Sequence, residues 1–361
     1  SGGQKQRVVI AIALASSPKL LIADEPTTSL DPATQKSVLD LLLSLKKTRS
    51  LAIILISHSV DVIDYFCDRT YVFDGFVFHK NSSSKSKTYL DNRLFLLKKI
   101  KSRIFLKSGV LDFKKLYRRE PLRSGFPIVS LKNISVSFKK AGGDFFAIKS
   151  VSASLSSSDL LGVIGGSGSG KTTLGRVFAG IETRFSGALE ARSIVLKKDS
   201  QLVYQDPFSS FNPKYTVGNS VSEIIKLFNS NHSVSNLFKL VELNDSFINR
   251  FPHELSGGEK QRVSIARVLA SNPRLIVFDE SLSALDTETQ YSILNLIRNI
   301  NMVFNITVVF ISHDIHSVLF LCKNILVLDN GKIVDNFRCE NLFLKNRNSY
   351  TKKLISDSFF L

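Results

Sequence analysis

Three short segments that are apolar almost throughout stand out in the C-terminal two thirds of the chain. They are Leu160–Ile164, Leu275–Phe278 and Ile306–Ile311, and each is followed at once by glycine or polar residues. Continuous apolar runs of this length are typical of parallel strands buried on both faces. The run Leu51–Ile56 is equally short, whereas a membrane-spanning helix needs about 20 apolar residues. The pattern predicts a buried parallel sheet and no membrane-spanning helix.

An internal repeat organises the chain. Alignment of Ser1 with Ser256, an offset of 255 residues, places 26 identical residues among the first 58 positions without a gap. The alignment superimposes Asp24-Glu25 on Asp279-Glu280, Asp31 on Asp286, and His58 on His313. So long a register indicates a duplicated unit. About 130 residues precede the aligned motif in the second copy, so we expect the first copy to lack its N-terminal part.

The repeat divides the chain into four predicted parts. These are the C-terminal portion of the first copy (1–79), a basic linker (80–126), a complete second copy (127–334) and a C-terminal extension (335–361). Between Lys80 and Arg123 the linker has 14 Lys or Arg residues against 3 Asp or Glu residues. It is either a solvated basic connector with a helical piece or a basic amphipathic surface that touches lipid or a partner.

Composition and charge narrow the class of protein. The 361 residues are 43% hydrophobic and 22% charged, which excludes global disorder. The net charge of +17 suits two acidic partners, nucleic acid or the anionic cytoplasmic face of a membrane. The three cysteines show no C-x-x-C spacing, which argues against a disulfide framework and a zinc site. We expect no cleaved secretory signal.

A glycine-rich loop follows the first apolar run and matches the pattern G-x-x-x-x-G-K-[ST]. Glycines let the backbone curl so that successive N–H groups point at phosphate oxygens, and the helix that begins near Lys171 adds its positive end. Lys171 is predicted to reach the β- and γ-phosphates, and the Thr172 hydroxyl to ligate Mg²⁺. The predicted nucleotide-contacting residues of this loop are Gly165, Gly166, Ser167, Gly168, Ser169, Gly170, Lys171, Thr172 and Thr173.

Acidic and imidazole side chains follow the other two apolar runs. The carboxyl ends of parallel strands form the usual ligand-binding edge of such a sheet, so these groups should lie beside the glycine-rich loop. We expect Asp279 to hold Mg²⁺, Glu280 to act as the general base on the attacking water, and His313 to contact the γ-phosphate. The sequence thus predicts Lys171, Glu280 and His313 as the catalytic groups.

These residues, with LSGGEKQ at 255–261 and SALD at 283–286, resemble the ATP-binding-cassette (ABC) ATPases. The resemblance implies a duplicated α/β P-loop NTPase fold with a mostly parallel sheet and a helical signature subdomain. It implies that Gln205 senses Mg²⁺ and couples to a membrane partner, and that Phe138 stacks on adenine. The signature and D-loop residues would be Ser256, Gly257, Gly258, Glu259 and Asp286, and the first-cassette equivalents Asp24, Glu25, Asp31 and His58.

The family resemblance also implies how the two copies cooperate. In ABC dimers each nucleotide lies between the phosphate loop of one cassette and the signature of the other. The first signature, Ser1, Gly2, Gly3 and Gln4, would then complete the ATP site at Lys171. Alternatively, second cassettes of two chains would pair, and Ser256 would face Lys171.

Three further segments resemble one branch of the family, the peptide and nickel importers. They are QDPFSSFNP at 205–213, RFPHE at 250–254 and SYTKKL at 349–354. The resemblance implies an ATP-hydrolysing importer subunit that works with integral-membrane permease subunits and, indirectly, with a solute-binding protein. Its place would be peripheral, on the cytoplasmic face of the membrane, with ATP and Mg²⁺ as cofactors and no nucleic-acid partner.

Two alternatives to the importer remain open. A soluble tandem ABC ATPase acting on ribosomes or nucleic acid would suit the net charge, but the importer-like segments would not be expected there. A degenerate pseudo-ATPase is disfavoured because Lys171, Asp279, Glu280 and His313 are all retained. The sequence does not name the transported solute, since solute contacts would lie on other subunits.

Overall fold

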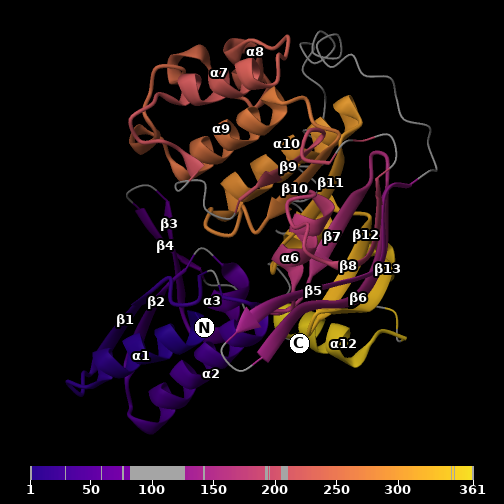
Figure 1. Cartoon of the computed structure of the whole chain (residues 1–361). Helices are drawn as coiled ribbons and strands as arrows, with labels where there is room; N and C mark the ends of the chain where they lie inside the picture. The colour runs from indigo at the N-terminus through magenta and orange to yellow at the C-terminus, as the bar shows by residue number, and fades with distance from the viewer. Residues whose placement is uncertain are drawn as a thin grey trace. The chain divides into compact units, whose positions relative to one another are not determined.

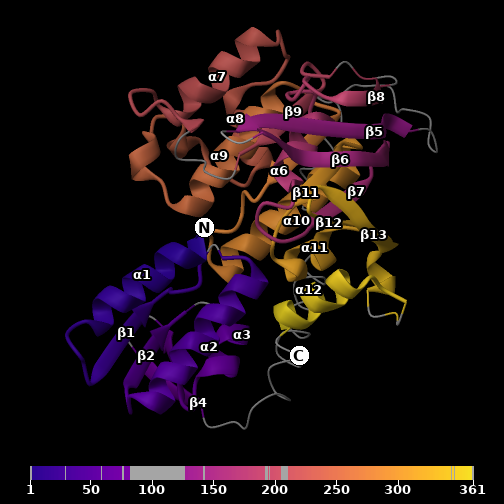
Figure 2. The same ribbon diagram turned by 60° about the horizontal axis from the view of Figure 1, so that its bottom comes forward.

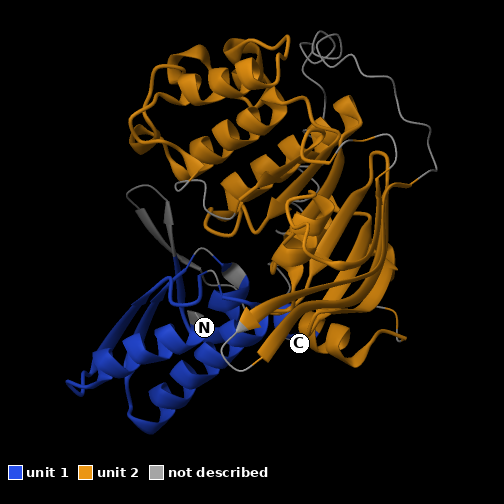
Figure 3. Ribbon diagram, viewed as in Figure 1, with its two compact units in different colours: residues 1–107, 356–361 blue, residues 108–355 orange. Residues whose placement is uncertain are grey.

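The computed structural model describes residues 2–28, 30–57, 59–74, 77–81, 127–140, 143–191, 194, 196–204, 210–342, 344 and 346–359. The chain divides into two compact units (Figure 3), residues 1–107 with 356–361 and residues 108–355. The predicted linker lies outside the described residues from position 82 to position 126. Its first two residues, Lys80 and Asn81, end a strand.

The first unit alternates helices and strands. Its elements are α1 (Gly2–Leu14), β1 (Leu20–Asp24), α2 (Pro32–Thr48), β2 (Ala52–Ile56), α3 (Val60–Phe66), β3 (Thr70–Asp74) and β4 (Val77–Asn81). Strands β1 and β2 pair in parallel, and β3 and β4 pair in antiparallel fashion. Val38, Leu39 and Leu42 of α2 are fully buried and form the centre of a small apolar core with Leu21 and Val62.

A six-stranded, mostly parallel sheet forms the centre of the second unit. Its strand order is β13-β12-β7-β11-β10-β9, and only β13 runs antiparallel to its neighbour. The strands are β7 (Leu160–Ile164), β9 (Ser200–Val203), β10 (Leu275–Asp279), β11 (Thr307–Ile311), β12 (Asn324–Asp329) and β13 (Lys332–Arg338). Every residue of β7, β10 and β11 is buried. The three apolar runs are therefore the central parallel strands, as the sequence predicts.

A three-stranded antiparallel sheet and a group of helices complete the second unit. The sheet has the order β6-β5-β8, from β5 (Pro127–Lys140), β6 (Gly143–Ser156) and β8 (Ser186–Ala191). The helices are α6 (Lys171–Phe178), α7 (Val217–Leu227), α8 (Val234–Leu240), α9 (Gly257–Ala270), α10 (Thr287–Phe304) and α11 (Ile315–Leu321), with short 3-10 turns at 245–247, 252–254 and 339–341. Helix α12 (Ser349–Phe359) begins in this unit, and its residues from Ser356 onward belong to the first. Helices α7, α8 and α9 lie together at one end of the unit (Figure 1), and Figure 2 shows the same elements turned by 60°.

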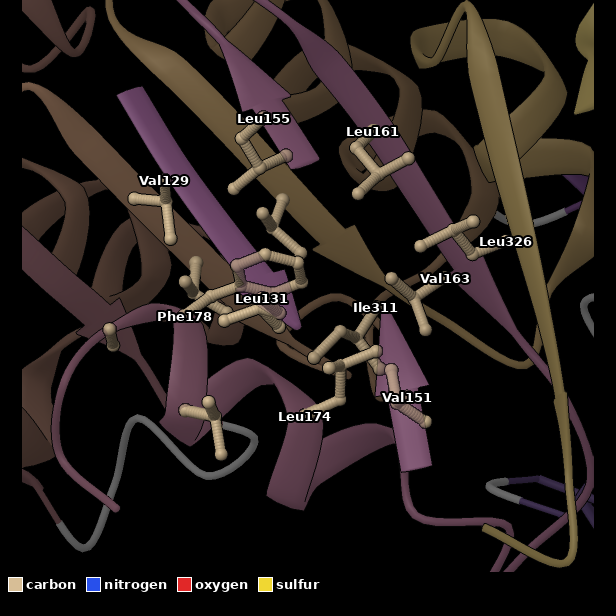
Figure 4. Packing of buried hydrophobic residues seen from close by; sticks show 14 of the residues in the cluster. Val129, Leu131, Val151, Leu155, Leu161, Val163, Leu174, Phe178, Ile311 and Leu326 are labelled. Carbon is tan, nitrogen blue, oxygen red and sulfur yellow. The ribbon is translucent and has the colours of Figure 1, made fainter. Parts of the chain in front are cut away.

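The core of the second unit lies between its two sheets and encloses α6. Leu174 and Phe178 of α6 point into a cluster with Leu131, Leu155 and Val163 from the strands (Figure 4). All of these side chains are at least 95% buried. This packing fixes the helix directly after the glycine-rich loop, so the position of the loop is set by the core.

The structure repeats its elements in the register that the sequence predicts. With the offset of 255 residues, β1 and β10 coincide residue for residue, as do β2 with β11 and α3 with α11. Helices α1 and α2 match α9 and α10 to within one residue at their ends. The predicted duplication is thus visible in the fold.

The structure also bears on membrane-spanning helices and on the state of the cysteines. Among the helices that the structure describes, none is long and apolar enough to cross a membrane. Cys67, Cys322 and Cys339 are free thiols. Cys322 is buried, and burial raises the pKa of its thiol far above the usual range.

Candidate active site

The glycine-rich loop joins the buried strand β7 to helix α6. Three of its glycines have positive φ angles: Gly165 at 154°, Gly168 at 76° and Gly170 at 103°. A Cβ on Gly170 would lie 2.4 Å from the Ala147 carbonyl oxygen, so a larger residue would collide with the backbone. Glycine is required at this position both for the left-handed conformation and for the close approach. The loop therefore has the curled backbone that phosphate binding needs.

Lys171 begins α6, and its side chain is 95% buried. Its Nζ donates hydrogen bonds to the carbonyl oxygens of Gly165 at 3.0 Å and Gly166 at 2.9 Å. It also lies 3.5 Å from Oε1 of Glu280. A buried ammonium group is thus held over the loop, next to the carboxylate that follows β10.

Thr172 and Asp279 face each other across the same edge. The Thr172 hydroxyl donates to Oδ1 of Asp279 at 3.1 Å. Burial raises the pKa of Asp279, and the Thr172 hydroxyl acts in the opposite direction. Hydroxyl and carboxylate oxygens are the ligands that Mg²⁺ prefers. The donor set therefore fits the predicted metal.

Glu280 lies between Lys171 and His313. Its backbone is left-handed (φ 46°), and its N–H donates to the Ile311 carbonyl at 3.0 Å, which fixes the residue at the ends of β10 and β11. Nδ1 of His313 lies 3.7 Å from Oε2 of Glu280. The pKa of Glu280 is lowered, chiefly by His313 and further by Lys171, while burial opposes the shift. The carboxylate is therefore kept ionised, as a general base requires.

The signature segment caps helix α9. Ser256 is the N-cap residue: its hydroxyl accepts a hydrogen bond from the Glu259 N–H at 3.3 Å, and the Glu259 carboxylate accepts one from the Ser256 N–H at 2.7 Å. This reciprocal pair is a capping box. Gly258 packs against α10, where an added Cβ would lie 2.4 Å from Cγ2 of Thr289. Gly257 precedes it, and Asp286 caps α10 by accepting from the Thr289 N–H at 3.0 Å.

The first copy reproduces this local geometry. Glu25 has the same φ of 46°, and its N–H donates to the Ile56 carbonyl at 3.0 Å. Asp31 caps α2 by accepting from the Thr34 N–H at 3.1 Å, and a Cβ on Gly3 would lie 2.3 Å from Cγ2 of Thr34. Asp24 ends β1, as Asp279 ends β10.

For several predicted site residues, the structure gives a location but no contact that tests the predicted role, or it does not describe the residue. Phe138 lies on β5, is 42% exposed and pairs in register with Phe145 of β6. Gly2, Gly3 and Gln4 lie in α1. Ser1, Gln205 and His58 lie outside the described residues. The adenine contact of Phe138, the Mg²⁺-sensing role of Gln205 and the role of the first signature stay predictions, as do those of Ser167, Ser169 and Thr173 at the phosphates.

One residue that contacts the glycine-rich loop, Tyr350, is not among the site residues predicted from the sequence. The hydroxyl of Tyr350, in α12, accepts a hydrogen bond from the Gly166 N–H at 2.8 Å. The two residues are 184 positions apart. The segment SYTKKL pointed to Tyr350 as part of a family element, but nothing in the sequence indicates its contact with the loop.

Comparison with known proteins agrees with the geometry. The ABC transporter family matches residues 1–28 and 148–283. The chain is 32% identical over 383 residues to the peptidoglycan transport ATP-binding protein YejF of Agrobacterium fabrum strain C58, which covers 99% of this chain and 68% of that protein. It is also 32% identical to the glutathione import ATP-binding protein GsiA of Escherichia coli K12. That alignment of 412 residues covers 99% of this chain and 64% of GsiA. The chain spans about two thirds of the length of these curated relatives.

Solved structures show the same fold. The ATP-binding cassette MJ0796, in a dimeric post-hydrolysis state bound to ADP and Pi, is similar with a TM-score of 0.53 and 28% identity over 58% of this chain and 98% of that chain. The cbiO1 structure from Clostridium perfringens, at 23% identity and a TM-score of 0.52, shows the fold alone. YejF is 32% identical to this chain and is covered over more than two thirds of its length, and the repeat, the phosphate loop and the signature helix agree with that match. This chain therefore belongs to the ABC transporter family of ATP-binding proteins, which are ATPases.

Proposed function

We propose that the second cassette binds Mg-ATP and hydrolyses it. The observation that carries this proposal is the cluster beside the phosphate loop, in which Glu280 lies 3.5 Å from Lys171 and 3.7 Å from His313. A cation, an ionised carboxylate and an imidazole are thus gathered at the end of the strands where the loop begins. Such a cluster suits phosphoryl transfer, where positioning and electrostatic stabilisation supply most of the catalysis.

Each group has a distinct role in the proposed reaction. Loop N–H groups other than that of Gly166, which donates to Tyr350, bind the phosphates together with the buried ammonium of Lys171. Lys171 also stabilises the charge that develops on the γ-phosphoryl group. Glu280 accepts a proton from the attacking water, and His313 orients that carboxylate and contacts the γ-phosphate. Thr172 and Asp279 would hold Mg²⁺, which supplies charge neutralisation at the phosphates.

Metal dependence tests this assignment. Phosphate release by the full chain should require Mg²⁺ and stop when the metal is chelated. Asp279→Asn should raise the Mg²⁺ concentration needed for half-maximal rate, because one anionic ligand becomes neutral. Asp199→Asn, a carboxylate outside the cluster, is the control and should leave the Mg²⁺ dependence unchanged. Hydrolysis that persists under chelation would refute the assignment.

We further propose that the chain is the ATP-hydrolysing subunit of an importer for peptides or a similar small solute. The similarity to YejF and GsiA supports this, since their names describe peptidoglycan transport and glutathione import. ATP hydrolysis would drive separate integral-membrane permease subunits, and the chain would attach to the cytoplasmic face of the membrane through them. A solute-binding protein would act on the permeases and only indirectly on this chain.

Cell fractionation separates the importer from a ribosome factor. The full-length protein should sediment with membranes after moderate salt washing when its permeases are present, and should leave that fraction when the permeases are deleted. The basic linker could hold protein at anionic lipid, at about 1 kcal/mol per basic residue before screening, so a high-salt wash is the control. Co-sedimentation with ribosomes would contradict the importer.

A further inference from the structure

The C-terminal extension contacts the phosphate loop itself. Gly166, the second residue of the loop, donates its N–H to the Tyr350 hydroxyl at 2.8 Å. A Cβ added at Gly166 would lie 3.0 Å from the same oxygen, so the hydroxyl sits directly against the main chain of the loop. The contact therefore joins a backbone group of the nucleotide site to a side chain outside the cassette core.

A chain of polar contacts fixes Tyr350 to the edge of the main sheet. Arg347 pairs with Asp335 of β13 at 3.0 Å, and both side chains are nearly buried, at 12% and 13% exposure. The Arg347 guanidinium also lies 4.2 Å from the Phe337 ring. Asn348 donates its N–H to the second oxygen of Asp335 at 3.3 Å, and its side chain accepts from the Tyr350 N–H at 2.8 Å. The start of α12 is thus tied to β13.

The first turns of the helix are buried. Thr351, Leu354 and Ile355 of α12 are at least 92% buried. The polar contacts of Arg347 and Asn348 hold the backbone of Tyr350 at the start of the helix. The hydroxyl is therefore a preorganised acceptor for the loop.

The far part of the loop is supported by the turn between β12 and β13. The Gly331 N–H donates to the Ser169 carbonyl at 3.0 Å, and the Gly331 carbonyl accepts from the Lys149 N–H at 2.7 Å. Between these supports, Gly168 adopts a φ angle of 76°, which glycine reaches at no steric cost because it has no Cβ. A loop built from glycines needs such supports, because each glycine loses much conformational entropy when the loop is ordered.

We propose that Tyr350 is a positioning residue that holds the phosphate loop of the second cassette ready for nucleotide. The C-terminal extension, anchored through Arg347 and Asp335, would in this way set the affinity for Mg-ATP. The proposal rests on the proposed function of the second cassette. A preordered loop binds phosphate without first losing entropy, so the hydroxyl acts on binding more than on the chemical step.

Tyr350→Phe tests the proposal because it removes one oxygen and keeps the ring. The full chain is titrated with Mg²⁺ and a fluorescent ATP derivative, and steady-state hydrolysis is measured alongside. We expect Kd and KM to rise about 2- to 10-fold, the usual effect of one lost hydrogen bond, with kcat nearly unchanged. Tyr71→Phe, an exposed tyrosine of β3, is the matched control and should change neither.

A second variant tests whether the two residues act through each other. Gly166→Ala places a methyl group against the Tyr350 oxygen and should weaken binding in the wild-type background. In the Tyr350→Phe background that oxygen is gone, so the same substitution should cost less, and the two effects should be non-additive.

The outcomes separate this inference from the proposed function. Wild-type affinity in Tyr350→Phe, tighter binding in Tyr350→Phe, or strictly additive effects in the double variant would each overturn the positioning role. A wild-type chain that does not bind Mg-ATP would instead refute the proposed function of the cassette.

Discussion

The two copies of the repeat share their backbone but differ in how their strands are covered. Glu25 and Glu280 have the same left-handed φ angle and the same 3.0 Å hydrogen bond to the neighbouring strand. Strands β10 and β11 are wholly buried between β9 and β7. Among the described strands, β1 and β2 pair only with each other, and Ile22 of β1 remains 61% exposed.

The difference shows which features are local. The left-handed glutamate, the aspartate N-cap at Asp31 and Asp286, and the glycine packed on threonine are present in both copies, so the repeated segment is sufficient to specify them. The contact of Glu280 with Lys171 is not local, because Lys171 lies in the phosphate loop, outside the repeated segment. Glu25 accepts a hydrogen bond from the Thr28 hydroxyl at 2.6 Å, and His58, the equivalent of His313, lies outside the described residues. The proposed chemistry therefore needs the part of the cassette that carries the phosphate loop.

The largest effect should come from removing the cation of that loop. Lys171→Ala should abolish measurable hydrolysis and greatly weaken ATP binding, because a buried ammonium is lost from the phosphate site. Lys214→Ala, which removes an exposed cation of the same cassette, is the control. Equilibrium ATP binding and phosphate release check both variants. Normal ATP binding in Lys171→Ala would show that nucleotide does not use this loop.

A pH profile sharpens the comparison between the two glutamates. His313 keeps the pKa of Glu280 below its usual value, so the base stays ionised in mildly acidic solution. His313→Ala should raise that pKa and move the acidic limb of the pH–rate profile to higher pH, besides lowering the rate. His253→Ala, an exposed histidine outside the cluster, should leave the limb in place. An unshifted limb in His313→Ala would contradict the pairing.

Smaller and nearly equal effects should follow when the shared helix contact is overpacked in either copy. Gly258→Ala pushes a methyl group into Thr289, and Gly3→Ala does the same at Thr34. Each should lower the free energy of unfolding by about 1–3 kcal/mol, and Thr289→Ser or Thr34→Ser in the same chain should recover part of the loss. Denaturant unfolding measures all four variants. A loss confined to one copy would show that the repeats do not pack alike.

Much of this fold could be predicted from the sequence because its signals are local. The apolar runs at 160–164, 275–278 and 306–311 match the central strands β7, β10 and β11 to within one residue at their ends, and the glycine-rich loop precedes α6 as expected. The capping box of Ser256 and Glu259 also follows from a local pattern, S-x-x-E. The predicted boundaries at 79 and 334 stay predictions; the neighbouring strands β4 and β13 end at Asn81 and Arg338.

Contacts between distant segments could not be predicted in this way. The hydrogen bond from Gly166 to Tyr350 joins positions 184 residues apart, and periodicity carries no information on it. The pairing of Arg347 with Asp335 likewise depends on where the extension returns to β13. The sequence therefore predicts which chemical groups could form the site, whereas the contacts that hold the loop in place can be read only from the fold.

One matched pair of variants tests most directly the claim that hydrolysis belongs to the second cassette. Glu280→Gln and Glu25→Gln make the same change at equivalent positions, and single-turnover hydrolysis of radiolabelled ATP measures each in the full chain. We predict that Glu280→Gln binds ATP but hydrolyses it about 10²–10³ times more slowly, while Glu25→Gln changes the rate at the Lys171 site far less. Near-normal hydrolysis by Glu280→Gln, or an equal loss in Glu25→Gln, would contradict the claim.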